Sequence, residues 1–453
     1  MYEIGSEFNY IDKEKYSADD ITRMYDGFGD VSFLRCGRDA IGFVCEDIKL
    51  EDIELLNESN TSNGSSSSNG SNSLNTVAAS IASDVSYNYV ALLPALCCDS
   101  MYRPFEVHGM KVLFYGINED LSVNRQSLKK LIDDVYKNGD DNLKVIVLTA
   151  VYYGITDIKE LDAYIKSIDS RIIVIEDVTQ GVLAPTEFDK ESADYVIGSI
   201  RKWMGIPDGA VAIKNCNNVS LIQNDQDAKE NDQSIHGDDQ GTNDFGKKVS
   251  FRLKPVLGDN SFATERSKAL RMKTQYLENG DQDLKAKFRA LLGHAEDTLT
   301  DGSDIYEMSD ESREYLKSIP VKNMVSTRNN NYDTLYELLD KSVYNNRYFK
   351  LFPHRIAQNP AFMLPVLMDT DKISKDLKTA GSIDRDGFER ILASKGIYAP
   401  VLWPVCDEAA IADPMSKEIA DHILCFWIDQ RYDRFDMVHS AECFEAVLRE
   451  LVG

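Results

Sequence analysis

The sequence contains few of the residues that build metal centres or disulfide frameworks. Among 453 residues it has eight cysteines and six histidines, and neither a Cys-x-x-Cys nor a His-Glu-x-x-His spacing occurs. The adjacent Cys97 and Cys98 are a poor start for a disulfide framework, so reduced thiols are expected. These absences argue against structural or catalytic zinc, and we expect no bound metal.

Long apolar runs and an excess of positive charge are also missing. No apolar run approaches the roughly 18 residues that a membrane-spanning helix needs. Lys and Arg number 50 against 75 Asp and Glu, a formal net charge of −25. Nucleic acids and anionic membrane surfaces bind clusters of Lys and Arg. We therefore expect a cytoplasmic protein that binds neither, although an anionic cofactor would need only a local positive group.

The chain is too long for one ordinary core, and we expect two domains. Between residues 31 and 213 short apolar strands alternate with helical patterns, which is typical of a largely parallel sheet with helices on both faces. Beyond this region long helices precede mixed elements, including an expected strand over 398–403. We predict an α/β fold with a large domain over 1–250, followed by linking helices and a small α+β domain over 251–453.

Three polar regions flank or interrupt this pattern. The first 30 residues are polar and are expected at the surface or at a partner subunit. Residues 57–80 are rich in Ser, Asn and Gly, and residues 216–247 are rich in Asn, Asp and Gln. Neither composition can bury a core, so both are predicted to be surface insertions.

The stretch over residues 171–209 has the strongest chemical pattern. Each of two short apolar strands is followed by a reactive side chain: Asp177 follows the first, and Ser199 and Lys202 follow the second. Open α/β sheets bind ligands at the carboxyl ends of their strands. A carboxylate that faces a heteroaromatic nitrogen and a lysine that can form a Schiff base are what pyridoxal phosphate chemistry needs. The alternative is an ordinary surface acid and lysine.

An earlier turn has the pattern of an anion site. A predicted strand over 31–36 leads into Gly37, Arg38 and Asp39, and a helical pattern over 40–50 follows. A helix that starts at such a turn presents unpaired N–H groups and the positive end of its dipole. An ordinary strand-to-helix turn capped by Asp39 would have the same sequence.

Several segments together resemble the fold-type-I pyridoxal-phosphate enzymes, and within them the DegT/DnrJ/EryC1/StrS aminotransferase family. The resemblance covers most of the chain outside the two insertions, and its most specific segment is GSIRKWMGIPDG at 198–209. It implies an enzyme that moves an amino group from an amino acid to a keto sugar, possibly nucleotide-linked, and that works as a homodimer. The other segments are CGRDAI (36–41), LLPALCCDS (92–100), FYGI (114–117), IEDVTQ (175–180), Arg328 with Asn331 and Tyr332, and IYAPVLWP (397–404).

The resemblance implies catalytic roles for particular residues. Lys202 matches the Schiff-base lysine, Asp177 matches the acid that pairs with the pyridine nitrogen, and Gln180 matches the contact to the phenolic oxygen of pyridoxal 5'-phosphate. A neutral Lys202 amine, favoured by desolvation or by neighbouring Arg201, could also move the proton between substrate carbon and cofactor carbon.

The resemblance also places the cofactor's phosphate and ring. Gly37, Arg38 and Asp39 match the phosphate-binding turn, and Ser199 matches a further phosphate contact. Cys98 stands where family members often place an aromatic residue that stacks on the cofactor ring. The family's Gly-Tyr-Asn segment, which follows the lysine and reaches the neighbouring subunit, is not found.

Candidate substrate residues are less specific. Tyr152 and Tyr153 follow a strand and could line the substrate pocket, although aromatic pairs more often fill a core. Arg328 opens a predicted helix and could bind a substrate carboxylate or phosphate, or only an acid of the protein.

Other functions share parts of this pattern. Decarboxylation, elimination and acyl transfer would use the same scaffold with Lys202 and Asp177, and a non-catalytic, partner-binding relative is a further alternative. Lys202 argues against the family's dehydratase variant, which has histidine there. Ser199-x-x-Lys202 lacks the partner motifs of penicillin-binding proteins. No G-x-G-x-x-G follows the first strand, which disfavours a nicotinamide-dependent oxidoreductase.

Overall fold

The computed structural model of the chain describes residues 3–10, 20–62, 88–139, 142–185, 188, 191–215, 250–258 and 261–453. Most of both predicted insertions lies outside the described residues. The exception is the start of the first one, because helix α2 (Gly37–Ser62) continues well past the expected end at residue 50.

The large sheet has the strand order β1-β7-β6-β5-β4-β2-β3. Strand β7 is antiparallel to both of its neighbours, and all the other pairs are parallel. This mainly parallel sheet confirms the predicted fold class. The bounds are β1 Gly29–Leu34, β2 Asn88–Pro94, β3 Lys111–Tyr115, β4 Leu143–Ala150, β5 Ile173–Asp177, β6 Tyr195–Gly198 and β7 Ala210–Asn215.

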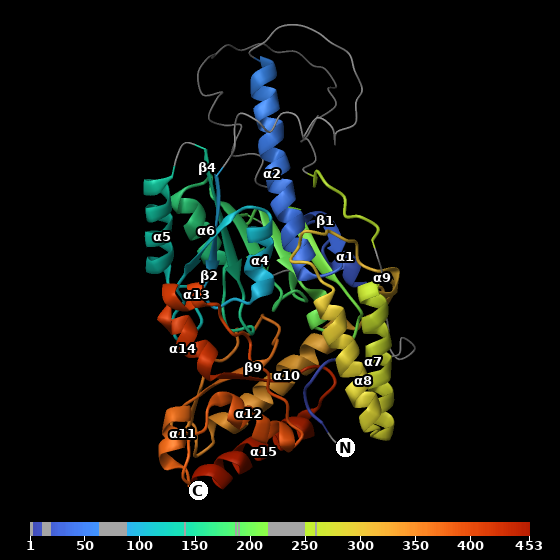
Figure 1. Ribbon diagram of the computed structural model, residues 1–453, viewed down its shortest axis with the longest axis vertical. Coiled ribbons are helices and arrows are strands. Elements are labelled where there is room, and N and C mark those ends of the chain that lie inside the picture. Colours follow the sequence, from blue (N-terminus) through green and yellow to red (C-terminus); the bar gives the residue numbers. More distant parts are fainter. Residues whose placement is uncertain are drawn as a thin grey trace, which may run out of the picture.

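The central strands are largely apolar because helices cover the sheet (Figure 1). Every residue of β6 and β7 is buried. Helix α2 packs across β1, β7 and β6, while α4 and α5 pack on β3. The remaining elements of this part are α1 (Ile21–Met24), α4 (Asp99–Val107), α5 (Arg125–Asn138), α6 (Lys159–Ile168) and the short helix η3 (Ile200–Lys202).

A second, antiparallel sheet has the order β10-β9-β8. Figure 1 shows it below the large sheet, with α10, α12 and α15 around it, and shows α7 and α8 side by side at the edge of the molecule. The bounds are β8 Phe349–Leu351, β9 Leu364–Met368, β10 Ile423–Phe426, α7 Ser261–Asn279, α8 Gln282–Asp297, α9 Asp310–Leu316, α10 Val321–Asp340, α11 Thr370–Asp376, α12 Arg385–Ser394, α13 Asp407–Ala412, α14 Pro414–His422 and α15 Arg434–Val452.

Two expectations about backbone structure were wrong. Residues 398–403 form no strand: Pro400 has no N–H to donate, although its carbonyl accepts from the N–H of Cys425. The N-terminal residues are not confined to the surface, because Ile4 is 1% exposed and packs in the core of the second sheet. A parallel bridge between Ile4 and Ile397 holds it there.

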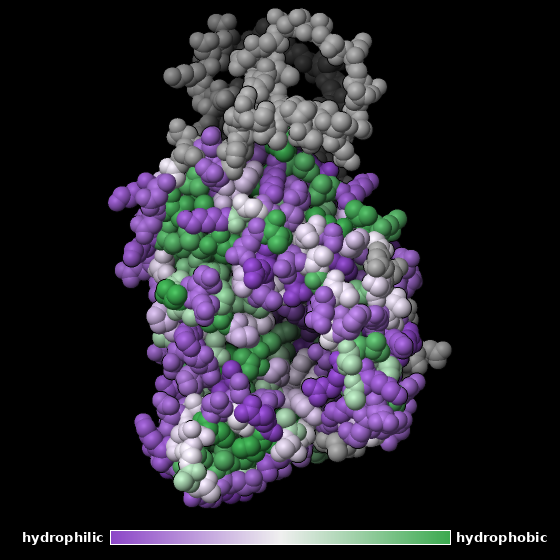
Figure 2. Space-filling view, in the orientation of Figure 1, coloured by the Kyte–Doolittle hydropathy of each residue, from purple (hydrophilic) through white to green (hydrophobic). Residues whose placement is uncertain are grey.

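The face in Figure 2 is mostly hydrophilic, with smaller apolar patches between the hydrophilic residues. Within the described ranges, no helix has both the length and the apolar character needed to cross a bilayer.

The core beneath the second sheet is centred on Phe444 of α15. Its ring meets three others near edge-on, with centroid distances of 5.1 Å to Phe349, 5.5 Å to Phe388 and 5.4 Å to Phe426. These rings come from β8, α12 and β10, so one side chain joins the sheet to two helices.

We expect Phe444→Ala to lower the free energy of unfolding by about 3–5 kcal/mol, because it leaves a cavity among three rings. Denaturant titration followed by circular dichroism measures the loss. Phe435→Ala is the control: it lies on the same helix, its side chain is 81% exposed, and it should change stability by about 0.5 kcal/mol or less. Equal losses in the two variants would contradict the central position of Phe444.

Candidate active site

The site begins with the parallel pairing of β5 and β6. Asp177, the last residue of β5, lies beside Ile197 near the end of β6. Chain leaving both strands therefore emerges at the same edge of the sheet, and Lys202 ends the short helix η3 that follows β6. Strand β1 runs in the same direction as β6, so the first residue of α2, Gly37, reaches this edge as well.

A pocket that is partly open to solvent lies at this edge. It brings together residues from five separate parts of the sequence. Thr179, which the sequence analysis missed, also lines it, two residues after the end of β5. The predicted residues that line the pocket are Gly37, Arg38, Cys98, Asp177, Ser199 and Lys202.

Asp177 is a buried acid with its carboxylate held in place. It is 6% exposed, and its Oδ1 accepts the backbone N–H of Thr179 at 2.8 Å. Burial raises the pKa of Asp177, while the Thr179 hydrogen bonds and the charge of Lys202 oppose that rise. A cationic ring N–H placed against Asp177 would stabilise the ionised form.

The loop that carries Lys202 is tied down by backbone hydrogen bonds. The N–H groups of Ile200 and Arg201 both donate to the carbonyl of Gly209 at 3.0 Å. The indole N–H of Trp203 donates to the carbonyl of Thr179 at 2.7 Å. The lysine amine lies 5.8 Å from the ring centre of Trp403, so an aromatic wall bounds the space around it.

The start of α2 has the features of an anion site. The first N–H groups of a helix have no partner inside the helix. Ser199 is 2% exposed, and its hydroxyl oxygen has no hydrogen-bond partner among the described residues. The Nε of Arg38 is also buried without a partner, while its Nη2 lies 3.8 Å from the carboxylate of Asp99. These unpaired groups fit a bound phosphate.

Asp39 does not line the pocket. It is fully buried and accepts two hydrogen bonds from the guanidinium of Arg35, at 2.9 and 3.0 Å, and one from the N–H of Tyr306. A carboxylate so engaged is no phosphate ligand, and Asp39 instead joins the start of α2 to the segment before α9.

Gln180 is buried beside the pocket. Its Oε1 accepts the backbone N–H of Tyr153 at 2.6 Å, and its Nε2 has no partner within the described part of the chain. Gln180 lines a neighbouring hollow together with Val178 and Pro360. Within the described residues, the NH2 group of Gln180 is therefore unpaired.

Tyr152 and Tyr153 do not reach the pocket. Both are almost completely buried, and their hydroxyls donate to the backbone carbonyls of Leu96 at 2.6 Å and Leu402 at 2.7 Å. Both rings fill the core between the large sheet and the segment near residue 402. The expectation that they contact substrate is not supported by this placement.

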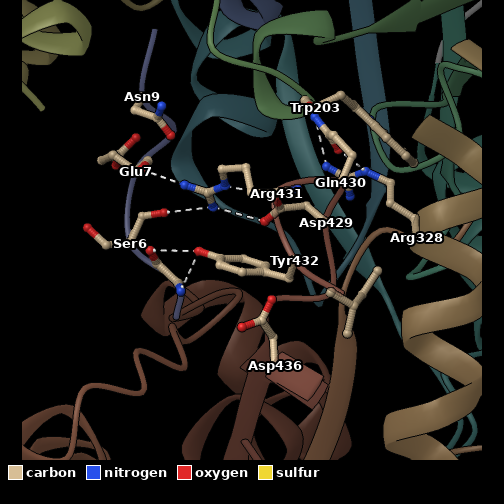
Figure 3. Close-up of polar contacts among 12 residues, drawn as sticks. Ser6, Glu7, Asn9, Trp203, Arg328, Asp429, Gln430, Arg431, Tyr432 and Asp436 are labelled. Carbon is tan, nitrogen blue, oxygen red and sulfur yellow. Dashed lines mark hydrogen bonds and ion pairs between the residues drawn. The ribbon is translucent and has the colours of Figure 1, made fainter. Parts of the chain in front are cut away.

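Arg328 is likewise a structural residue in this fold (Figure 3). It has no exposed surface, and it donates to Gln430 Oε1 at 2.8 Å, to the carbonyl of Phe362 at 2.9 Å and to the carbonyl of Trp203 at 3.1 Å. The Nε2 of Gln430 donates to the same Trp203 carbonyl at 2.8 Å. Burial lowers the pKa of Arg328 to about 10. Arg328 therefore positions the loop after Lys202 and does not face a substrate.

The fold is that of the fold-type-I pyridoxal-phosphate-dependent aminotransferases. The aminotransferase TlmJ from Streptoalloteichus hindustanus shares 12% identity, with a TM-score of 0.55 and 99% of each chain covered. A DegT DnrJ EryC1 StrS aminotransferase from Brucella abortus shares 11% identity, with a TM-score of 0.52 over 95% of this chain and 91% of that one.

A third solved structure, DesI in the presence of its TDP-sugar product, shares 10% identity. Its TM-score is 0.54, with 99% of this chain and 94% of that chain covered. No family model and no curated protein matches the sequence. At these identities the likeness to solved structures establishes the fold.

Arg328→Lys should lower the free energy of unfolding by about 1–3 kcal/mol, because an ammonium cannot reach three fixed acceptors and leaves buried carbonyls unpaired. Chemical denaturation measures the change. Arg434→Lys, at an exposed position that starts α15, should be close to neutral. Unchanged stability combined with weaker substrate binding would instead place Arg328 in the substrate site.

Proposed function

We propose that this protein is a pyridoxal-phosphate-dependent aminotransferase that moves an amino group from an amino acid to a keto sugar. The observation that carries the proposal is a single pocket at the strand ends of this fold. It is lined by Lys202, by the buried acid Asp177, and by Arg38 and Ser199, which have hydrogen-bond donors without partners among the described residues. The solved neighbours with the same fold are aminotransferases, and DesI was solved with a TDP-sugar product. By that likeness the keto sugar is nucleotide-linked.

The residues present fit the cofactor. The start of α2, Arg38 and Ser199 would hold its phosphate, and the free amide of Gln180 would donate to its phenolic oxygen. Bound there, pyridoxal phosphate supplies an electron-accepting ring for the bond changes at the substrate's amine carbon. Asp177 would accept the ring N–H and keep that nitrogen protonated.

Lys202 has two tasks in this proposal. Its amine would hold the cofactor by a covalent bond, and the free amine would take a proton at Nζ and return it. The wall formed by Trp403 excludes water on one side of Nζ. Cys98 packs where a flat ring would stack; its thiol is buried, and burial raises its pKa, so it stays protonated and does not compete as a nucleophile.

We also propose that the chain forms two domains. Residues 1–250 form the cofactor-binding domain, and residues 251–453 form the linking helices and the small domain. The protein works in the cytoplasm as a homodimer, in line with the sequence resemblance.

Protein incubated with pyridoxal phosphate should show a visible absorption band, and borohydride should fix the cofactor on Lys202, as peptide mass spectrometry would show. Lys202→Ala should lose both the band and the adduct. Lys322→Ala, which removes an exposed lysine of α10, should keep both. An adduct on another lysine, or no band in the unmodified protein, would refute the Lys202 assignment.

Asp177→Asn should still bind the cofactor but transfer amino groups on the order of 100-fold or more slowly, because an amide does not hold the ring nitrogen in its charged form. The rate at which an amino acid bleaches the visible band measures the first half of the reaction. Equal rates in Asp177→Asn and the unmodified protein would show that the acid has no role in the chemistry.

A further inference from the structure

Arg201 lines the same pocket as Ser199 and Lys202, and neither the sequence pattern nor the proposed function uses it as a ligand. Its two terminal nitrogens donate to the carboxylate of Glu296, at 2.7 and 3.1 Å. Its remaining nitrogen, Nε, is buried and has no partner among the residues that the structure describes. The N–H on Nε of this cation is therefore unsatisfied.

The environment of this N–H is an anion site. The Nε of Arg38 and the hydroxyl of Ser199 are the other buried side-chain atoms without partners that line this pocket. Burial raises the pKa of the Cys36 thiol, immediately before α2, to about 12, and the charge of nearby Arg201 opposes part of that rise. These three groups, from two segments, thus belong to residues that line the same pocket as the first residue of α2, and each of them can donate to a phosphate oxygen.

Glu296 fixes the direction of Arg201. The same carboxylate accepts from Arg266 of α7 at 2.8 Å, and Arg266 is anchored by a bond from its Nε to the carbonyl of Pro207. Although burial acts to raise it, the charges of Arg201 and Arg266 lower the pKa of Glu296 to about 2. Arg201 and Arg266 also lie at equal distances from the ring of Phe262, 5.6 Å each. Helices α7 and α8 thereby hold the guanidinium against the pocket.

We propose that Arg201 is a third side-chain ligand of the cofactor's phosphate and that Glu296 is a positioning residue that orients it. This inference rests on the proposed function. A hydrogen bond to a dianionic phosphate, made by a cation that needs no reorientation, strengthens binding of the phosphate and leaves binding of the ring unchanged.

The test compares pyridoxal phosphate with pyridoxal, which lacks the phosphate. Apparent dissociation constants for both are measured on cofactor-free protein from the visible band, and their ratio reports the phosphate alone. Arg201→Gln should lower the preference for pyridoxal phosphate about ten-fold or more, since hydrogen bonds to charged groups contribute that much. Glu296→Gln should lower it in the same direction and by less.

Arg266→Gln is the matched comparison. It breaks the same ion cluster, but Arg266 does not line the pocket, so the preference should fall by clearly less than in Arg201→Gln. Thermal unfolding checks that each variant is folded. Arg201→Lys, which lacks Nε, replaces Arg201→Gln if the latter does not fold, and a lowered preference is again expected.

Each result decides one question. If Arg201→Gln weakens both compounds equally, or if Arg266→Gln lowers the preference as much, Arg201 only supports the loop and the inference fails. An unchanged preference in Glu296→Gln removes the positioning role. If the unmodified protein forms no adduct at Lys202 with either compound, the proposed function itself fails.

Discussion

The parallel pairing of β5 with β6 is the interaction on which the site depends. It brings the acid and the lysine to one edge of the sheet, although they come from different strands. Thr179 then connects them: its N–H binds Asp177, its hydroxyl accepts the N–H of Ser199, and its carbonyl accepts the indole N–H of Trp203. Because most of these contacts are to the backbone, the spacing between Asp177 and Lys202 is set by the strands and not by surface charges.

Buried guanidinium groups extend this control to the rest of the molecule. Arg328 joins the second sheet to the carbonyl of Trp203, one residue after the lysine. Arg431 pairs with buried Asp429 and also donates to the carbonyls of Ser6 and Glu7, which holds the N-terminal segment in place (Figure 3). Hydrogen bonds to its donors offset the cost of burying a cation, so each of these two arginines fixes the position of several backbone groups.

Local patterns identified much of this site, because its main residues directly follow apolar strands or start a helix. Asp177, Lys202, Ser199 and Gly37 all belong to that group. The residues predicted to contact substrate, Tyr152, Tyr153 and Arg328, do not line the pocket. A tyrosine after a strand has the same sequence context whether it faces a ligand or the core, and Tyr153 is core because its hydroxyl meets a carbonyl at residue 402. No local pattern contains that contact.

The sequence alone determined the alternation of strands and helices, because periodicity and chain order are local properties. That alternation also determined the edge of the sheet at which the acid, the lysine and the turn at Gly37 would meet. The tertiary structure decided which polar groups stay unpaired. Asp39 accepts hydrogen bonds from Arg35 and from the N–H of Tyr306, and Arg328 donates to distant carbonyls. By contrast, Nε of Arg38 and the hydroxyl of Ser199 have no partner among the described residues. Pairing depends on residues far apart in the chain, and so only the folded molecule separates ligands from structural supports.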